Sequence, residues 1–235
     1  AIINVKGSSI ARESDYVLYT NAGPEIAVAS TKAYTTQLAV FYLIVARMAH
    51  SRGVFDDAQT QSFVRELQRT PEVMKKVLER RRDIHVVAKK VLGAKDLFMI
   101  GRGLDYSILL EGSLKLKEVS YIHSEAYASG ELKHGPIALI TQDTPVVATV
   151  TQEKLMSKEL SNIKSRGADV VVFIKESIAG DLAKEYEIFT LPDMRDEFMV
   201  LPASVALQLL AYYVSSDKGF DVDKPRNLAK VVTVE

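Results

Sequence analysis

The sequence predicts an α/β fold of three-layer αβα sandwiches with parallel sheets, arranged as a tandem pseudo-repeat whose first copy is incomplete. Two observations predict it. Short segments that are apolar throughout alternate with helical segments over residues 95–219, and strands that bury both faces are typical of parallel sheets covered by helices. In addition, two parts of the chain separated by about 171 residues resemble each other, as expected for a repeated unit.

The composition is that of an ordinary globular protein and excludes several classes of function. The 235 residues are 47% apolar and 26% charged, and the net charge of zero argues against a non-specific nucleic-acid surface. The lack of cysteine excludes disulfides and a thiol nucleophile, and it fits a reducing cytoplasm. The four histidines show no metal-ligand spacing, so no metal is expected. No apolar run approaches the roughly 18–20 residues that span a membrane.

The first 94 residues predict the end of one α/β unit followed by connecting helices. Two apolar runs predict buried strands, at residues 1–5 and 16–20. A helical pattern follows from Ser30, a plausible N-cap, to Ala49. The charged region 54–94 carries Leu and Val at helical spacing and predicts two or three helices, one of them beginning at Pro71. We therefore assign residues 1–53 to the C-terminal part of a first unit.

Residues 95–219 predict a second α/β unit. Four apolar segments predict its strands, at 96–101, 145–150, 169–174 and 187–191. Helical patterns occupy the intervals, at 105–120, 153–165, 178–184 and 197–216. Doubly wound sheets bind ligands beyond the C-terminal ends of their strands, and the Gly-Arg-Gly turn at 101–103 lies at one such end. Such a turn is a weak signal, equally typical of a plain tight turn.

The internal repeat includes the helices as well as the strands. Gln37-Leu38 matches Gln208-Leu209 in the corresponding helical segments. At the same offset the first unit would begin roughly 75 residues upstream of Ala1. We therefore expect the sequence to be part of a longer chain whose upstream residues complete the first unit.

A stripe of charged residues lies within the helix predicted at 105–120. Glu111, Lys115 and Glu118 are spaced i, i+4 and i+7, which places them on one face, whereas Lys117 points elsewhere. One explanation is a solvated face with Glu–Lys pairs. The other is a Lys–Glu pair that faces a ligand, in which the carboxylate stays ionised and can act as a general base on a carbon acid.

Three motifs resemble the isomerase domain of the glucosamine-6-phosphate synthase family, the isomerizing glutamine–fructose-6-phosphate aminotransferases. They are "GPEIAVASTKAYTTQL", "EGSLKLKEVSYIHSEAYASGELKHGPIALI" and "DKPRNLAKVVTVE". The resemblance covers essentially all 235 residues in order. It implies two SIS (sugar isomerase) subdomains in tandem, the second at 95–219, joined by the helices of 54–94. A C-terminal tail at 220–235 would carry the active-site lysine.

The resemblance also implies a reaction and a role for each matching residue. Ammonia from glutamine is added at C2 of fructose 6-phosphate, and the ketose is isomerised to give glucosamine 6-phosphate without a cofactor. Glu118 would move the proton between C1 and C2, and Lys115 would stabilise the enolate-like charge. Lys230 would form a Schiff base with the open ketose. His134 would open the sugar ring from the neighbouring subunit, which implies a homodimer. Three further residues would line the sugar site: Val28, Ser30 and Ala229.

Two departures from the family bear on what this sequence does alone. The N-terminal glutaminase domain of the family is absent from it. The Ser/Thr-rich loops that hold the sugar phosphate in the family would lie upstream of Ala1, so we expect weak or no binding of fructose 6-phosphate by these 235 residues alone. Two other functions share the fold: a non-catalytic phosphosugar-binding module and a sugar-amine deglycase. The combination of Glu118, His134 and Lys230 favours the synthase over the binding module, and the "RNLAK" sequence of the tail favours it over the deglycase.

The proposed chemistry carries three geometric expectations. Lys115 and Glu118 should face a cleft shared with the 101–103 turn, and Lys230 should lie near Glu118. The tail from Asp221 to Glu235 should be ordered against the fold. Its apolar anchors would be Val231, Val232 and Val234.

Overall fold

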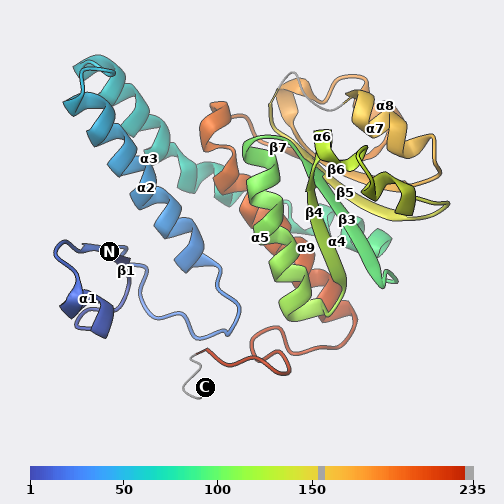
Figure 1. Cartoon of the computed structure of the whole chain (residues 1–235), viewed down its shortest axis with the longest axis horizontal. Helices are drawn as coiled ribbons and strands as arrows, with labels where there is room; N and C mark the ends of the chain where they lie inside the picture. The colour runs from blue at the N-terminus through green and yellow to red at the C-terminus, as the bar shows by residue number, and fades with distance from the viewer. Residues whose placement is uncertain (153–156, 231–235) are drawn as a thin grey trace.

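The structure, a computed structural model, describes residues 1–152 and 157–230. Its main feature is a five-stranded sheet in the order β4-β3-β5-β6-β7, in which every neighbouring pair is parallel (Figure 1). The strands are β3 (Asp96–Gly101), β4 (His123–Ala128), β5 (Pro145–Val150), β6 (Asp169–Lys175) and β7 (Glu187–Leu191). This confirms the α/β class with parallel sheets.

Helices cover both faces of this sheet, as the apolar strands require. In β3, Leu97 and Met99 join one hydrophobic cluster, and Phe98 and Ile100 join the other, because successive side chains point to opposite faces. The first face is covered by α4 (Arg81–Val91), α5 (Leu104–Ser120) and α9 (Val200–Asp217). The second is covered by α7 (Ser157–Lys164) and α8 (Leu182–Glu185). The start of the predicted helix at 153–165 lies outside the described residues.

The helix α9 is strongly apolar and packs against α5. The segment Asp196–Asp217 is long and apolar enough to cross a membrane by composition, because its most apolar 18-residue window has a mean hydropathy of 1.6. The sequence did not predict such a span. However, 78% of its most apolar window is buried in the fold. Gly112 permits the close approach of the two helices, because a Cβ there would lie 2.9 Å from Leu207 Cδ1. These properties are those of a core helix.

The N-terminal part forms a second, smaller sheet. β1 (Ile2–Ile3) and β2 (Leu18–Tyr19) pair in parallel and are shorter than the predicted strands at 1–5 and 16–20. Each has a strand neighbour on one side only. A short helix that the sequence did not predict, α1 (Ser9–Glu13), connects them, and α2 (Lys32–Ser51) follows. Four large apolar side chains of α2 are about half exposed: Phe41, Leu43, Val45 and Met48.

The region 54–94 forms two helices, α3 (Asp57–Glu79) and α4, with α3 packed beside α2 (Figure 1). The prediction that a helix begins at Pro71 is wrong, because Pro71 lies inside α3. Proline has no N–H to donate to the carbonyl of Leu67, four residues earlier. The Thr70 hydroxyl donates to that carbonyl at 2.7 Å instead, so the acceptor stays satisfied and the helix continues.

The strand β4 is the one strand of this sheet that the sequence did not predict. It lies at the edge and pairs only with β3, and its side chains alternate between exposed His123, buried Ser124 and exposed Glu125. Ser113 and Ser124 exchange hydrogen bonds between side-chain hydroxyls and backbone carbonyls at 2.8 and 2.9 Å, which joins β4 to α5. The loop after β4 contains α6 (Ser129–Leu132) and a 3-10 turn, η1 (Pro136–Leu139). A polar edge strand lacks the apolar run that reveals the central strands.

The helix α3 begins with a capping box that gives a testable stability prediction. Asp56 Oδ1 accepts from the Gln59 backbone N–H at 2.7 Å, and Gln59 Oε1 accepts from the Asp56 N–H at 2.9 Å. Asp56→Ala should lower the free energy of unfolding by about 1 kcal/mol, measured by urea denaturation. Gln61→Ala, at an exposed position of the same turn, should change it by less than about 0.5 kcal/mol. Equal losses in the two variants would contradict the capping role.

Candidate functional site

The charged stripe of α5 is largely buried. The Lys115 side chain is 5% exposed, and its Nζ lies 2.6 Å from Glu118 Oε2 and 3.4 Å from Glu111 Oε1. The side chains of Glu111 and Glu118 are 13% and 21% exposed. A solvated helix face therefore does not describe these three residues, whereas Lys117, on a different face, is exposed. The expected spacing on one stripe is confirmed.

The electrostatics of the stripe depend on Lys115. Burial raises the pKa of Glu111 above its ordinary value, and the Lys115 ammonium opposes this shift. Glu118 Oε2 lies 2.6 Å from Lys115 Nζ, so its carboxylate is paired with the buried ammonium. An ionised carboxylate can take a proton from a ligand as a general base.

Two separate cavities are lined by residues of the stripe in the C-terminal half of α5. Lys115 lines a cavity of about 180 Å³ together with Ala27, Ala29 and Val222. Glu118 lines one of about 410 Å³ beside the tail residues 226–228. The expectation of a cleft shared with the 101–103 turn is wrong, since neither cavity is lined by that turn. The turn precedes α5, whereas Lys115 and Glu118 lie in the last two turns of this 17-residue helix.

The tail is held against the end of α5. Tyr121 ends the helix in the left-handed conformation with φ 60°, and its hydroxyl accepts from the Arg226 backbone N–H at 2.8 Å. The Arg226 guanidinium lies 4.1 Å from the centre of the Tyr121 ring, a cation–π arrangement. Asp221 Oδ1 accepts from the N–H groups of Asp223 and Lys224 at 2.9 and 3.0 Å, which forms a turn. The tail through residue 230 is therefore ordered, and Val231, Val232 and Val234 lie outside the described residues.

Lys230 reaches the segment that precedes α2. Its Nζ lies 3.2 Å from Glu25 Oε2, 3.4 Å from Ser30 Oγ and 3.5 Å from the Val28 carbonyl oxygen. Two of the predicted sugar-lining residues therefore contact the predicted Schiff-base lysine, and the exposed Ala229 adjoins it in sequence. Among the described residues, no hydrogen bond or ion pair joins Lys230 directly to Glu118. The segment 27–31 contacts Lys230 through Val28 and Ser30, and it also lines the cavity of Lys115, the ion-pair partner of Glu118.

His134 is not brought to this site within one chain. It is exposed and follows α6, with its backbone N–H donating to the Glu131 carbonyl at 3.0 Å. The chain leaves the end of α5 through β4 and reaches α6 at the opposite end of the sheet (Figure 1). His123 lies nearer in sequence to Glu118, but it is exposed and its Nδ1 lies 3.0 Å from Asp96 Oδ1.

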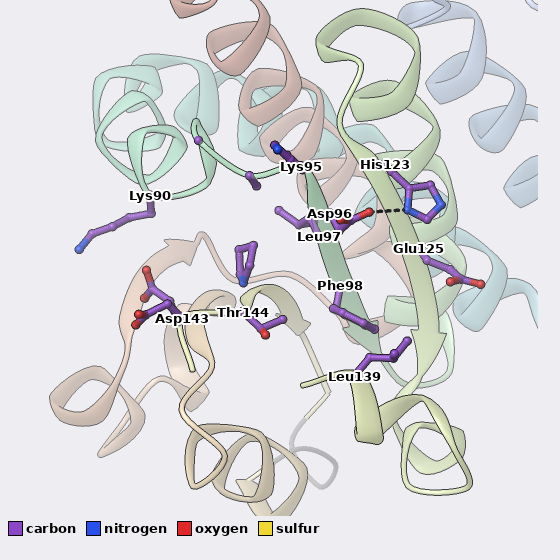
Figure 2. A pocket seen from close by; sticks show the side chains of 14 residues that line it. Lys90, Lys95, Asp96, Leu97, Phe98, His123, Glu125, Leu139, Asp143 and Thr144 are labelled. Atoms are coloured by element: carbon purple, nitrogen blue, oxygen red, sulfur yellow. Dashed lines mark hydrogen bonds and ion pairs between the residues drawn. The ribbon is translucent and has the colours of Figure 1, made fainter. Parts of the chain in front are cut away.

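A larger cavity, of about 850 Å³, lies elsewhere on the molecule (Figure 2). It is bordered by the first residues of β3, β4, β5 and β6, at the N-terminal edge of the sheet. Lys90 and Lys95 are among its lining residues, together with acidic residues such as Asp143 and Glu125 (Figure 2). None of the predicted site residues lines it. Its size alone does not make it the functional site, because it does not gather the groups that the proposed chemistry needs.

The structure adds two site residues that sequence reasoning did not select. Glu25 contacts Lys230, and Gln208 of α9 lines the Lys115 cavity with a buried Nε2 that has no hydrogen-bond partner among the described residues. Gln208 was visible in the sequence as a member of the internal repeat, in which it matches Gln37. Glu25 had a different signal, since an acidic residue shortly before a helix can satisfy its first N–H groups.

Comparisons with known proteins agree with the fold and extend over the whole chain. A profile of the SIS domain matches residues 1–47 and 90–215. Glutamine–fructose-6-phosphate aminotransferase (isomerizing) of Caldanaerobacter subterraneus subsp. tengcongensis is 51% identical over 100% of this chain, and its relative in Escherichia coli O157:H7 is 45% identical. The chain spans 39% of the length of these curated relatives.

A solved structure has the same arrangement of elements. The C-terminal domain of glucosamine-fructose-6-phosphate aminotransferase from Francisella tularensis superposes with a TM-score of 0.88 at 37% identity. The match covers 95% of this chain and 64% of that domain.

Proposed function

Because this chain belongs to the SIS domain family, we propose that it is the isomerase part of a glutamine–fructose-6-phosphate aminotransferase. The full enzyme would combine fructose 6-phosphate with ammonia from glutamine to give glucosamine 6-phosphate, an early step of amino-sugar synthesis. The similarity of the whole chain to the C-terminal part of such enzymes supports this proposal. The part of the relatives outside the match leaves room for a separate N-terminal domain, which would release ammonia as a glutaminase.

The observation that carries the proposal is the buried Lys115–Glu118 pair, which opens on cavities beside the tail. Lys230 Nζ would add to C2 of the open ketose and water would leave, which gives an iminium. Ammonia would then replace the lysine. The electron-withdrawing iminium acidifies the C1 proton, so the Glu118 carboxylate is an adequate base to take it and return it at C2. The C1 hydroxyl gives its proton to the amine that forms on C2, so C1 becomes the aldehyde of an aldose, and the Lys115 cation would stabilise the enolate-like charge on the C1 oxygen as that proton leaves.

The remaining roles are those that the family resemblance implies, and the positions of the residues support them. Val28, Ser30 and Ala229 would line the sugar next to Lys230. His134 would open the ring in the site of a second copy, in keeping with its place far from Glu118 in its own chain. A homodimer in the cytoplasm, with no cofactor, is therefore part of the proposal. The proposed division of the chain is residues 1–53 in a first SIS subdomain, 54–94 in connecting helices, 95–219 in a second subdomain and 220–235 in the tail.

The tail lysine provides a direct chemical test. In the intact protein, borohydride added with fructose 6-phosphate should reduce the imine to a secondary amine at Lys230, which mass spectrometry of a proteolytic digest would locate. Lys224→Ala, which removes an exposed lysine of the same tail, should leave the adduct in place. An adduct confined to another lysine, or none from protein that turns over fructose 6-phosphate, would contradict the Schiff-base role.

A further inference from the structure

We propose that Glu25 is a positioning residue for Lys230, holding the lysine amine where it meets the C2 carbon of the sugar. The inference rests on the proposed function, because it concerns the lysine that would form the Schiff base. It adds to the proposed function by naming Glu25 as the residue that connects the tail to the rest of the site.

The Glu25 carboxylate joins two parts of the chain that are far apart in sequence. One oxygen, Oε1, accepts from the backbone N–H groups of Thr31 and Ala33 at 2.8 and 3.4 Å and from the Thr31 hydroxyl at 3.3 Å. The other, Oε2, lies 3.2 Å from Lys230 Nζ. The side chain is only 9% exposed, and that of Lys230 is 36% exposed. The first turn of α2 thus fixes a carboxylate that in turn fixes the lysine.

The contacts of the neighbouring backbone support the same arrangement. The Val28 N–H donates to the Asp223 carbonyl at 2.9 Å, so the segment before α2 and the tail are also joined next to Lys230. The lysine then finds two further acceptors, the Val28 carbonyl and Ser30 Oγ. Three acceptors around one ammonium determine its position more closely than a single ion pair on a flexible side chain would.

A helix cap alone does not explain this geometry. Thr31, at the N-cap position of α2, is a residue type that often caps a helix with its own side chain, yet it makes no such hydrogen bond here. The cap is supplied from six residues upstream by a longer side chain. Glu25 caps the helix with Oε1, so its other carboxylate oxygen, Oε2, is available to accept from Lys230.

The ionisation of Glu25 limits what it can do. Burial would raise its pKa, but the hydrogen bonds from Thr31 and Ala33 and the charge of Lys230 outweigh burial and lower the pKa to about 2. Glu25 is therefore a fixed anion at neutral pH and a poor base, so it does not take the proton that Lys230 must lose before it attacks. Glu25 holds the Lys230 nitrogen in place. When the iminium forms, this nitrogen is positively charged again, and the Glu25 carboxylate lies beside that charge.

The test compares Glu25→Gln with the wild type in the intact protein. We expect kcat to fall about 10- to 100-fold, as for loss of a hydrogen bond to a charged group, with KM changed less than about threefold. The yield of the borohydride adduct at Lys230 should fall in parallel. Glu13→Gln, at an exposed glutamate of the first unit, should match the wild type in all three measurements. Glu25→Asp keeps the charge on a side chain one methylene shorter, which cannot reach both α2 and Lys230, so its adduct yield should lie between those of Glu25→Gln and the wild type.

A double-mutant cycle separates positioning from stability. If Glu25 acts through Lys230, then Glu25→Gln should have no further effect on kcat in a Lys230→Arg background. A purely structural cap would instead lower the unfolding temperature while the adduct yield and kcat per folded molecule stay at the wild-type level, and that result would overturn the inference.

If Glu25→Gln does not fold, the test uses Glu25→Asp instead. A wild-type adduct yield in that variant, with unchanged kinetics, also overturns the inference. A wild type that forms no adduct at Lys230 defeats the proposed function itself, which distinguishes the two failures.

Discussion

Glu118→Gln in the intact protein is expected to reduce turnover of fructose 6-phosphate by about 10²- to 10⁴-fold, the usual contribution of a positioned general base. The amide keeps the size and shape of the side chain but cannot take a proton from C1. Fructose 6-phosphate should still bind within about tenfold of the wild-type affinity, because no binding contact is removed. Steady-state kinetics with glutamine, together with equilibrium binding of fructose 6-phosphate, would measure the two effects separately.

The matched control is Glu125→Gln. Glu125 is an exposed carboxylate on β4, seven residues beyond Glu118, and it lines the larger cavity of Figure 2. This variant should turn over at the wild-type rate. The assignment of Glu118 as the base would be contradicted by near-normal turnover in Glu118→Gln, or by losses of similar size in both variants.

Lys115→Met is expected to lower the free energy of unfolding by about 3–5 kcal/mol at pH 8, the cost of leaving buried charges without their partner. Lys115 is the cation between Glu111 and Glu118, and methionine fills a similar volume without the charge. Lys117→Met, at an exposed position of the same helix, should change the unfolding free energy by less than about 1 kcal/mol. Urea denaturation of both variants would measure the difference.

The loss in Lys115→Met should depend on pH with a definite sign. Burial already raises the pKa of Glu111 in the folded protein, and removal of Lys115 removes the charge that opposes this shift. A carboxyl whose folded pKa is raised binds more protons folded than unfolded, so it destabilises the fold as pH rises and ceases to do so as pH falls. The difference from the wild type should therefore shrink between pH 8 and pH 5. A difference that grows on acidification would contradict the assignment of buried, unpaired carboxylates.

How much of the fold the sequence predicts depends on how each element is buried. The strands β3, β5, β6 and β7 were predicted within one residue of their bounds, because central parallel strands are apolar throughout. The edge strand β4 has one neighbouring strand and alternates in exposure, so its sequence resembles a polar loop. Pro71 gave a false helix start because a single hydroxyl, that of Thr70, replaces the missing hydrogen bond.

The part of the candidate site that lies on one helix could be predicted from the sequence. The part that forms where separate segments of the chain meet could not. Helical spacing alone places Lys115 beside Glu118. Spacing cannot show which end of the helix faces a cavity, and the expected link to the 101–103 turn was therefore wrong. The contact of Glu25 with Lys230 joins residues 205 positions apart, and no local pattern specifies it.

The central claim is that the sugar lies where the tail meets α5, rather than in the larger cavity at the N-terminal edge of the sheet. A crystal structure of the intact protein, reduced with borohydride in the presence of fructose 6-phosphate, tests this claim most directly. The account predicts continuous density between Lys230 Nζ and C2, with the Glu118 carboxylate about 3 Å from C1 or C2. Sugar bound between Lys90 and Asp143, or attached to Lys230 with Glu118 turned away from it, would contradict it.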